Sequence, residues 1–172
     1  LGHEMRNALK GNNRFECIFT DVAELDICNA EAVKQIIADN HIDYIVNCAA
    51  YTQVDKAEDN AELCKKINTD AVENLARAAA DYGARMIHIS TDYVFNGRGY
   101  SPYTEDMPPD PQSVYGSTKL EGEKILTDIC PESIIIRTAW LYSPYGNNFV
   151  KTMLHLGEER EELSVVADQI GT

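Results

Sequence analysis

The chain has 172 residues, of which 44% are hydrophobic and 25% charged. This composition supports one packed domain and excludes an intrinsically disordered chain. The formal net charge of −13 excludes a general nucleic-acid role, because phosphate binding needs a basic surface. No apolar run reaches the length of a membrane span. The five cysteines form no CxxC pair, so we expect free thiols in a reducing cytoplasm.

Predicted strands and helices alternate along the chain. The run FECIFT (15–20) predicts a short buried strand, and apolar residues at helical spacing predict a helix over 30–39. The later expected elements are a strand at 42–50, a helix over 55–82 that ends at Gly83, a strand at 85–90, a helix over 114–129, a strand at 133–142, a weak helix over 148–160 and a strand at 163–166. This order favours a mostly parallel sheet covered by helices on both faces, a doubly wound, Rossmann-like α/β fold.

Polar residues at the ends of the predicted strands are the first candidates for a site. In open α/β sheets, ligands bind beyond the carboxyl ends of the strands. Asp21, the segment 48–55, the segment 90–95 and the segment 138–142 occupy those positions. We therefore expect the functional residues of the chain among them.

The segment VYGSTKLEGEK (114–124) opens the predicted helix over 114–129. Tyr115 and Lys119 are one turn apart and share a helix face. An ammonium close to a phenol lowers the phenol pKa from about 10 by ~1–3 units, which would make Tyr115 a proton donor near neutral pH. Ser90 or Thr91 would present a hydroxyl at the end of the strand at 85–90, and the hydroxyl of Thr91 could hold a substrate oxygen beside Tyr115. The alternative is a tyrosine packed at the core edge and a solvated lysine, because YxxxK is common on helices.

Seven segments carry a resemblance to a known family. They are NCAAYTQVDKAE (47–58), INTDAVENLA (67–76), HISTDYVFNG (88–97), VYGSTKLEGEK (114–124), IIRTAWLY (135–142), GNNFVKTML (146–154) and VVADQIGT (165–172). In this order they resemble the extended short-chain dehydrogenase/reductase family, and within it the dTDP-4-dehydrorhamnose reductases. STDYVF, RTAW and GNNFVKTML are more specific than YxxxK, which the whole superfamily shares.

The resemblance implies a reaction and a role for each catalytic residue. The reaction would be the NAD(P)H-dependent reduction of the 4-keto group of dTDP-4-dehydrorhamnose to dTDP-L-rhamnose. Tyr115 would protonate the keto oxygen, Lys119 would tune Tyr115 and bind the nicotinamide ribose, and Thr91 would be the hydroxyl member. Asn68 stands where relatives carry an asparagine beside the lysine, and the alternative is a structural polar contact inside a helix.

The resemblance also implies substrate contacts for Thr91, Asp92 and Trp140. Related sugar-nucleotide dehydratases carry an Asp-Glu pair after the threonine, whereas this chain has Asp92-Tyr93. A tyrosine does not replace the glutamic acid in water elimination, so reduction is favoured. Asp92 would contact the sugar hydroxyls and Trp140 the sugar or nicotinamide. The alternatives are a strand-end aspartate that turns the chain and a core tryptophan.

The cofactor would lie against the first half of the chain. The resemblance implies contacts at a short set of positions: Gly2, Asp21, Asp26, Ile27, Ala49, Ala50, Tyr51, Thr52, Tyr115 and Lys119. An aspartate at position 21 can bond a ribose 2′-hydroxyl and favour NAD over NADP, or it can serve only the turn, so both NADPH and NADH stay open. Glu4 matches a residue that some relatives use at a Mg²⁺-linked dimer contact, and a solvated acid in a first helical turn is the alternative.

The resemblance finally implies a longer protein. A first strand and most of a glycine-rich turn would precede Leu1, and most of a nucleotide-sugar domain would follow Thr172. Residues 1–172 would then be a partial NAD(P)-binding domain, with the substrate-binding part starting after about residue 140. The expected partner is a nucleotide sugar, and a homodimer stays open. Two alternatives remain for the function. One is another nucleotide-sugar reductase or epimerase, and the other is a non-catalytic relative such as the regulatory subunit of methionine adenosyltransferase.

Overall fold

The computed structural model describes residues 1–166. The chain divides into two compact units. The sheet unit comprises Ile18–Arg137, and the terminal unit combines Leu1–Cys17 with the residues from Thr138 onward. Each unit is described by itself.

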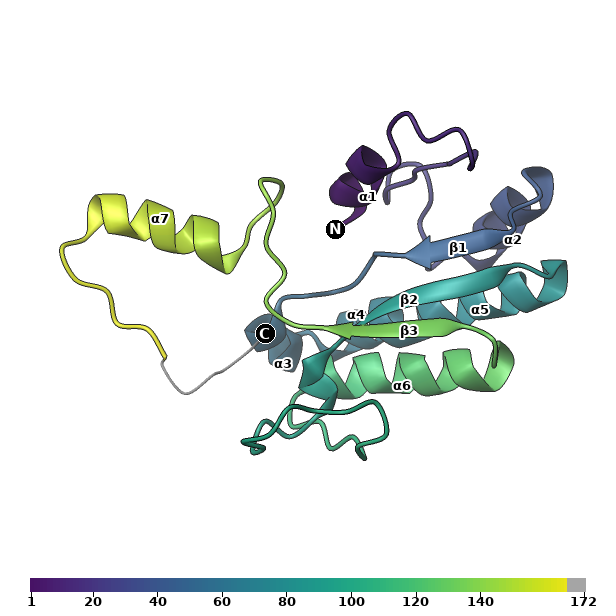
Figure 1. The fold of residues 1–172 in the computed structure, drawn as a ribbon. Helices are drawn as coiled ribbons and strands as arrows, with labels where there is room; N and C mark the ends of the chain where they lie inside the picture. The colour runs from purple at the N-terminus through teal and green to yellow at the C-terminus, as the bar shows by residue number, and fades with distance from the viewer. Residues whose placement is uncertain (167–172) are drawn as a thin grey trace. The chain divides into compact units, whose positions relative to one another are not determined.

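A three-stranded sheet with the order β1-β2-β3 forms the centre of the sheet unit (Figure 1). Its strands are β1 (Tyr44–Asn47), β2 (Arg85–Thr91) and β3 (Ile134–Thr138). β1 and β2 run parallel, with Tyr44 opposite Arg85 and Asn47 opposite His88. Since a helical connection joins each strand to the next, the predicted Rossmann-like α/β class is confirmed.

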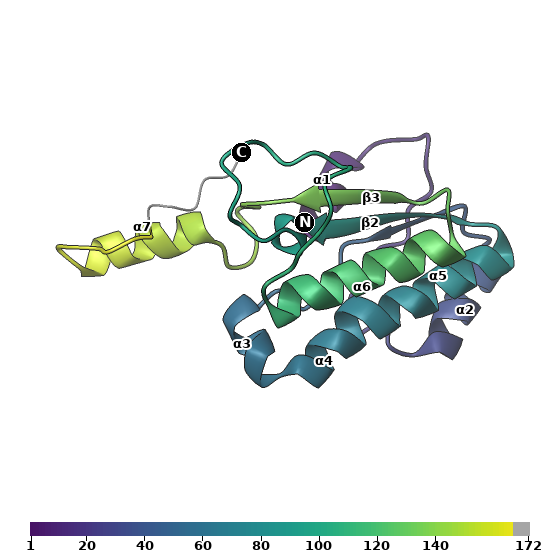
Figure 2. The ribbon, with the colours of Figure 1, turned by 90° about the horizontal axis from the view of Figure 1, so that it is seen from below.

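Helices pack against one face of this sheet. α2 (Ala30–Asp39), α5 (Ala71–Tyr82) and α6 (Val114–Ile129) lie side by side along it (Figure 2). The buried cluster between helices and sheet consists of Val33, Ile37, Val72, Leu75, Ala76, Ala78, Met86 and Leu126. Alternate residues of the outer strands, Tyr44, Val46, Ile134 and Ile136, are exposed, as expected for side chains on the opposite face of the pleat.

α2 and α6 have the predicted bounds because each has a strong start signal. The Asn29 side chain accepts a hydrogen bond from Ala32 N at the start of α2. Ser113 accepts one from Gly116 N at the start of α6. Such N-caps satisfy an amide that the first turn leaves without a partner. Gly83, with φ of 73°, ends α5 as predicted, since glycine tolerates the left-handed conformation of a helix C-terminus.

The single helix predicted over 55–82 is wrong in its continuity. Residues 54–82 form α3 (Val54–Asp59), α4 (Ala61–Lys65), a π-helical turn (Lys66–Asp70) and α5. Asn60 leaves the helical region, with φ −127° and ψ 42°, and separates the first two helices.

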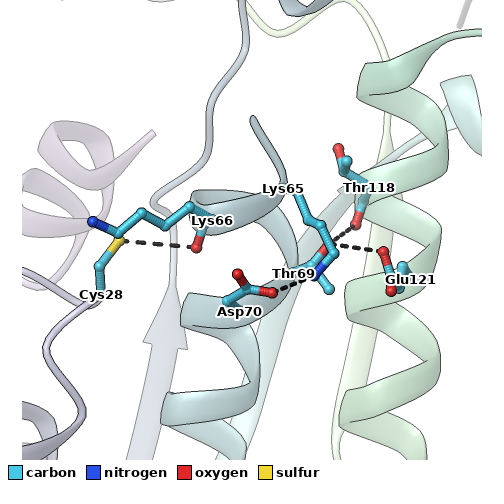
Figure 3. Close-up of polar contacts among 7 residues, drawn as sticks. All are labelled: Cys28, Lys65, Lys66, Thr69, Asp70, Thr118 and Glu121. Atoms are coloured by element: carbon cyan, nitrogen blue, oxygen red, sulfur yellow. Dashed lines mark hydrogen bonds and ion pairs between the residues drawn. The ribbon is translucent and has the colours of Figure 1, made fainter. Parts of the chain in front are cut away.

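The π-helical turn is held by contacts from three sides (Figure 3). Lys65 Nζ bonds Asp70 Oδ1 at 2.6 Å, the Thr69 hydroxyl donates to Thr118 O at 2.9 Å, and the Cys28 thiol donates to Lys66 O at 3.8 Å. π-Helical turns inside α-helices occur frequently at functional sites. Cys28 and Thr118 are far in sequence from the turn that they contact. Helical periodicity alone therefore could not predict this turn.

The strands predicted at 15–20 and 163–166 are wrong. Both segments are irregular, and Phe15, Ile18, Val165 and Val166 are about half exposed or more. A strand exists only where a neighbouring strand takes its backbone hydrogen bonds. The apolar residues of these segments favour an extended chain but do not supply that neighbour.

The terminal unit contains α1 (Gly2–Ala8) and α7 (Phe149–Glu159). Tyr145 joins its two parts, because its hydroxyl accepts a hydrogen bond from Asn7 Nδ2 at 3.0 Å and its ring stacks on His3. Across residues 1–166, no helix is long and apolar enough to cross a membrane. All five cysteines are free thiols.

Candidate active site

The carboxyl edge of β1 and β2 brings several predicted site residues together. Thr91 is the last residue of β2, and the segment 48–52 directly follows β1. Because β1 and β2 are parallel neighbours, these two positions lie at the same edge of the sheet. Tyr115 and Lys119 are on the first turns of α6, which packs against β2 and the 3₁₀ turn after it. Thr91, Tyr115 and Lys119 are all buried, with exposed fractions of 5%, 9% and 1%.

Gly116 lets the start of α6 approach the loop after β2. A Cβ atom at this position would lie 2.2 Å from the backbone oxygen of Tyr93, so only glycine fits without a shift of the backbone. The rings of Tyr93 and Tyr115 meet edge to face, 5.5 Å apart. Tyr115 also packs with Ala57 and Cys64. The phenol is therefore held in one place by packing on several sides.

The pKa of the Tyr115 phenol lies above its ordinary value. Burial is the largest cause, because it penalises the phenolate, and the nearby Asp92 carboxylate raises the pKa further. A hydrogen bond with the Thr91 side chain acts in the opposite direction. The predicted lowering of this pKa by Lys119 is wrong for this structure. The side chain that interacts with the Tyr115 phenol is therefore that of Thr91.

Lys119 is directed into the sheet. Its Nζ donates a hydrogen bond to Ile89 O at 2.7 Å and lies 3.1 Å from His88 Nε2. Burial lowers the pKa of this amine from 10.5 to about 8, although Glu123 on the same helix raises it. The amine therefore changes charge close to physiological pH.

Two buried polar residues of the site were missed by the sequence analysis. His88 on β2 is fully buried, and its Nδ1 lies 3.1 Å from Nδ2 of Asn47 at the end of β1. Burial and the nearby Lys119 lower the pKa of His88 to about 3, so the imidazole is neutral. The available signal was alternation: within RMIHIS, His88 shares a face with Met86, which is in the core.

Asn68 holds the segment after β1. Its Oδ1 accepts a hydrogen bond from Tyr51 N at 2.9 Å, and its Nδ2 donates to Tyr51 O at 3.1 Å. Nδ2 also lies 3.4 Å from the Thr118 hydroxyl on α6. These contacts fit the structural alternative for Asn68. They connect the π-helical turn, α6 and the 48–52 segment in one network.

The predicted cofactor residues of this unit divide into two groups. Ala49 and Thr52 are exposed, and Ala50 and Tyr51 are half-buried, at the open edge of the sheet. Asp21 and Asp26 make local turns, accepting from Val22 N at 2.8 Å and Cys28 N at 2.9 Å, respectively.

Ile27 packs against the main core, and its carbonyl accepts a hydrogen bond from Asn74 Nδ2 at 3.1 Å. Asp92 lies next to Thr91, whose hydroxyl donates to its carboxylate at 3.2 Å. Nucleotide or sugar contacts by these residues stay predictions.

Gly2, Glu4 and Trp140 belong to the terminal unit, and their predicted roles likewise stay predictions. Trp140 has a left-handed backbone with φ of 53° and meets the Phe149 ring edge to face at 5.4 Å. Within residues 1–166, no cluster of three or more His, Cys, Asp or Glu side chains could hold a metal ion. The structure therefore gives no support to Mg²⁺ at Glu4.

A parallel sheet with a buried threonine, tyrosine and lysine at its carboxyl edge defines the short-chain dehydrogenase/reductase class of Rossmann-like proteins. The family model for the RmlD substrate binding domain matches residues 1–172, and the chain belongs to this family.

Relatives and solved structures agree with this assignment. The dTDP-4-dehydrorhamnose reductase of Escherichia coli K12 is 47% identical over 177 residues, which cover 99% of this chain and 58% of that protein. The crystal structure of a dTDP-4-dehydrorhamnose reductase from Clostridium acetobutylicum superposes with a TM-score of 0.92 at 49% identity, over 96% of this chain and 58% of that one. The Bacillus anthracis reductase in complex with NADP gives 0.88 at 41% identity, over 94% and 59%. The chain thus spans a little under three fifths of the length of these relatives.

Proposed function

We propose that the protein reduces the 4-keto group of dTDP-4-dehydrorhamnose to give dTDP-L-rhamnose, with NADPH or NADH as hydride donor. The observation that carries this proposal is the burial of Thr91, Tyr115 and Lys119 where the first turns of α6 pack against the carboxyl end of β2. Relatives 45–49% identical to this chain are dTDP-4-dehydrorhamnose reductases, and the reductase of Bacillus anthracis was crystallised with NADP.

The chain offers a fitting surface for a nicotinamide dinucleotide. Ala49 and Ala50 present small side chains at the open end of β1, where a nucleotide can approach the backbone closely, as in other α/β sheets. Asn68 fixes this segment through both hydrogen bonds to Tyr51. A bound nicotinamide would supply the hydride, and the residues at the edge of the sheet would orient the substrate.

Tyr115 would act as the general acid. Its raised pKa keeps the phenol protonated at neutral pH, so it can donate a proton to a keto oxygen that becomes an alkoxide. Thr91 would hold the same oxygen, because its hydroxyl is next to the phenol. Lys119 would assist only in its protonated form, since a cation near the phenol stabilises the phenolate left after proton transfer.

The test is the Tyr115→Phe variant of the full-length protein. Because the ring keeps its contacts with Tyr93 and the small cluster around Cys64, the fold should remain. Turnover, followed by the loss of reduced-nicotinamide absorbance with dTDP-4-dehydrorhamnose, should fall about 10²–10⁴-fold.

Tyr82→Phe is the matched control, because Tyr82 is exposed on α5 and its hydroxyl has no part in the proposal. A Tyr115→Phe variant that keeps the normal rate would remove Tyr115 from the reaction. A wild-type protein that does not reduce this substrate would contradict the proposed function itself.

A further inference from the structure

Three buried polar groups form a chain behind the proposed acid: Asn47 on β1, His88 on β2 and Lys119 on α6. Their exposed fractions are 4%, 0% and 1%, so water cannot satisfy them. Their hydrogen atoms must therefore be distributed so that each contact has one donor and one acceptor.

Asn47 fixes the distribution at one end. Its Oδ1 accepts a hydrogen bond from Ala49 N at 3.0 Å, which sets the orientation of the amide. Nδ2 therefore faces His88 Nδ1, 3.1 Å away. An amide nitrogen can only donate, so Nδ1 of His88 must be the unprotonated, accepting nitrogen.

The protonation state of the other ring nitrogen, Nε2, follows from that of Nδ1. A neutral imidazole carries one N–H, so Nε2 of His88 holds the proton. Nε2 lies 3.1 Å from Lys119 Nζ. An ammonium has three donors and no acceptor, so it cannot receive this proton in a hydrogen bond. A neutral amine can, through its lone pair, while it still donates to Ile89 O at 2.7 Å.

We propose that His88, with its tautomer fixed by Asn47, is a positioning residue that binds Lys119 only as a neutral amine. When Lys119 takes up a proton, its ammonium faces the Nε2–H of His88 and must turn away from it. Lys119 can therefore act as a cation toward Tyr115 only after its amine has given up the contact with His88. This inference deepens the proposed function, since it assigns the control of the lysine charge in the same site.

Other titratable groups around Lys119 bear on its charge. Glu123 and Tyr115 lie on its own helix, and Cys64 approaches from α4. Glu123 is already paired with Arg137 of β3 through a 2.7 Å contact. None of these groups accepts a hydrogen bond from Lys119 in the contacts of residues 1–166, which makes His88 and Ile89 O the groups that set the amine position.

The direct test is the tautomer of His88 in the full-length protein, measured by NMR with ¹⁵N-labelled imidazole rings. The His88→Gln variant identifies the signal, since the chain has four histidines. We expect a neutral ring with the proton on Nε2, and a shift of the Nε2 signal as Lys119 titrates near pH 8. A proton on Nδ1 would overturn the inference whether or not the protein reduces the proposed substrate.

Asn47→Asp supplies the second measurement. A carboxylate accepts from Nδ1–H, so the ring proton should move to Nδ1 and free Nε2 to accept from an ammonium. The pH at which kcat/KM falls on the alkaline side should rise by about one unit or more, as for other amines stabilised in their charged form. Asn74→Asp is the matched control, since the Asn74 side chain on α5 donates to Ile27 O, far in sequence from the Asn47–His88–Lys119 chain, and should change neither readout.

The pH readout is needed because a purely structural role for His88 would lower activity equally at every pH. If Asn47→Asp does not fold, the wild-type tautomer alone decides. An unchanged tautomer in a folded Asn47→Asp protein would contradict the role assigned to Asn47. A wild-type protein that is inactive but has the Nε2–H tautomer would contradict the proposed reaction. It would still support the hydrogen-bond pattern assigned to Asn47, His88 and Lys119.

Discussion

The two ends of α6 pack against the same face of the sheet but meet different kinds of neighbours. The first turns place Tyr115 and Lys119 against Thr91 and His88, which are polar and buried. The last turns place Leu126 in the main core with Met86, Val72 and Leu75. One helix therefore carries a hydrogen-bonded region and an aliphatic region less than three turns apart.

This contrast separates the residues that stabilise the fold from those that carry the chemistry. Burial of aliphatic side chains stabilises the folded state, whereas a buried amine costs free energy because it loses its hydration. The lowered pKa of Lys119 is the signature of that cost. The aliphatic end fixes α6 in place, so the polar end can hold groups that are unfavourable by themselves.

Lys119→Met should show the largest effect on activity. Turnover should fall about 10²–10⁴-fold, the range for loss of a group that assists proton transfer. The free energy of unfolding should fall by only about 1–3 kcal/mol, because His88 Nε2 and Ile89 O lose a partner while the cost of a desolvated amine is removed.

Urea unfolding together with the turnover assay checks both parts. Lys124→Met is the control, since Lys124 is exposed on the same helix. A large loss of stability on Lys119→Met would show that the polar end also holds the fold together, and the contrast between the two ends would fail.

Leu126→Ala should have the opposite profile. Leu126 is fully buried, and its truncation should lower the free energy of unfolding by about 2–5 kcal/mol through lost contacts and the cavity left behind. Turnover per folded molecule should remain near wild type, because Leu126 is two helical turns from Lys119.

Thermal and urea unfolding measure this loss. Leu63→Ala, at an exposed position of α4, should cost far less. If Leu126→Ala instead reduces turnover as strongly as Lys119→Met, then the position of α6 rather than the identity of its polar groups limits the reaction.

The sequence predicted the bounds of the helices better than the contacts of their buried polar side chains. The bounds of α2 followed from apolar residues at helical spacing, and the structure adds side-chain caps at Asn29 and Ser113 that explain why α2 and α6 begin where they do. Thr91, Tyr115 and Lys119 are all buried at this end of α6, and their catalytic roles remain predictions. Local signals sufficed here because each involves residues a few positions apart.

Features that depend on distant partners were missed. The π-helical turn is held by contacts from Cys28 and Thr118, and a strand at 15–20 would need a neighbouring strand. The predicted direction of the Tyr115 pKa shift was wrong because the prediction rested on Lys119 alone, one turn along the helix. In the folded chain, Lys119 turns toward His88, and burial decides the pKa of the phenol.

The smallest expected effect is a change in the free energy of unfolding with each pH unit below pH 7. It tests the polar end of α6 directly, because His88 lies there. His88 has a pKa of about 3 in the folded state, below its ordinary value of 6.5. Between these values the unfolded chain binds the additional proton, so stability rises with pH across this window and is lost as the pH falls through it. The contribution is at most about 1.4 kcal/mol per pH unit.

His88→Phe should flatten this part of the profile, because an aromatic ring of similar shape has no proton to gain. The free energy of unfolding, measured in urea at steps from pH 7 to pH 4, provides the comparison with wild type. His155→Phe is the matched control, since His155 is exposed on α7 and should leave the slope unchanged. A wild-type slope retained in His88→Phe would mean that carboxylates elsewhere set the acid profile, and that the buried imidazole does not hold the neutral state on which the contact with Lys119 depends.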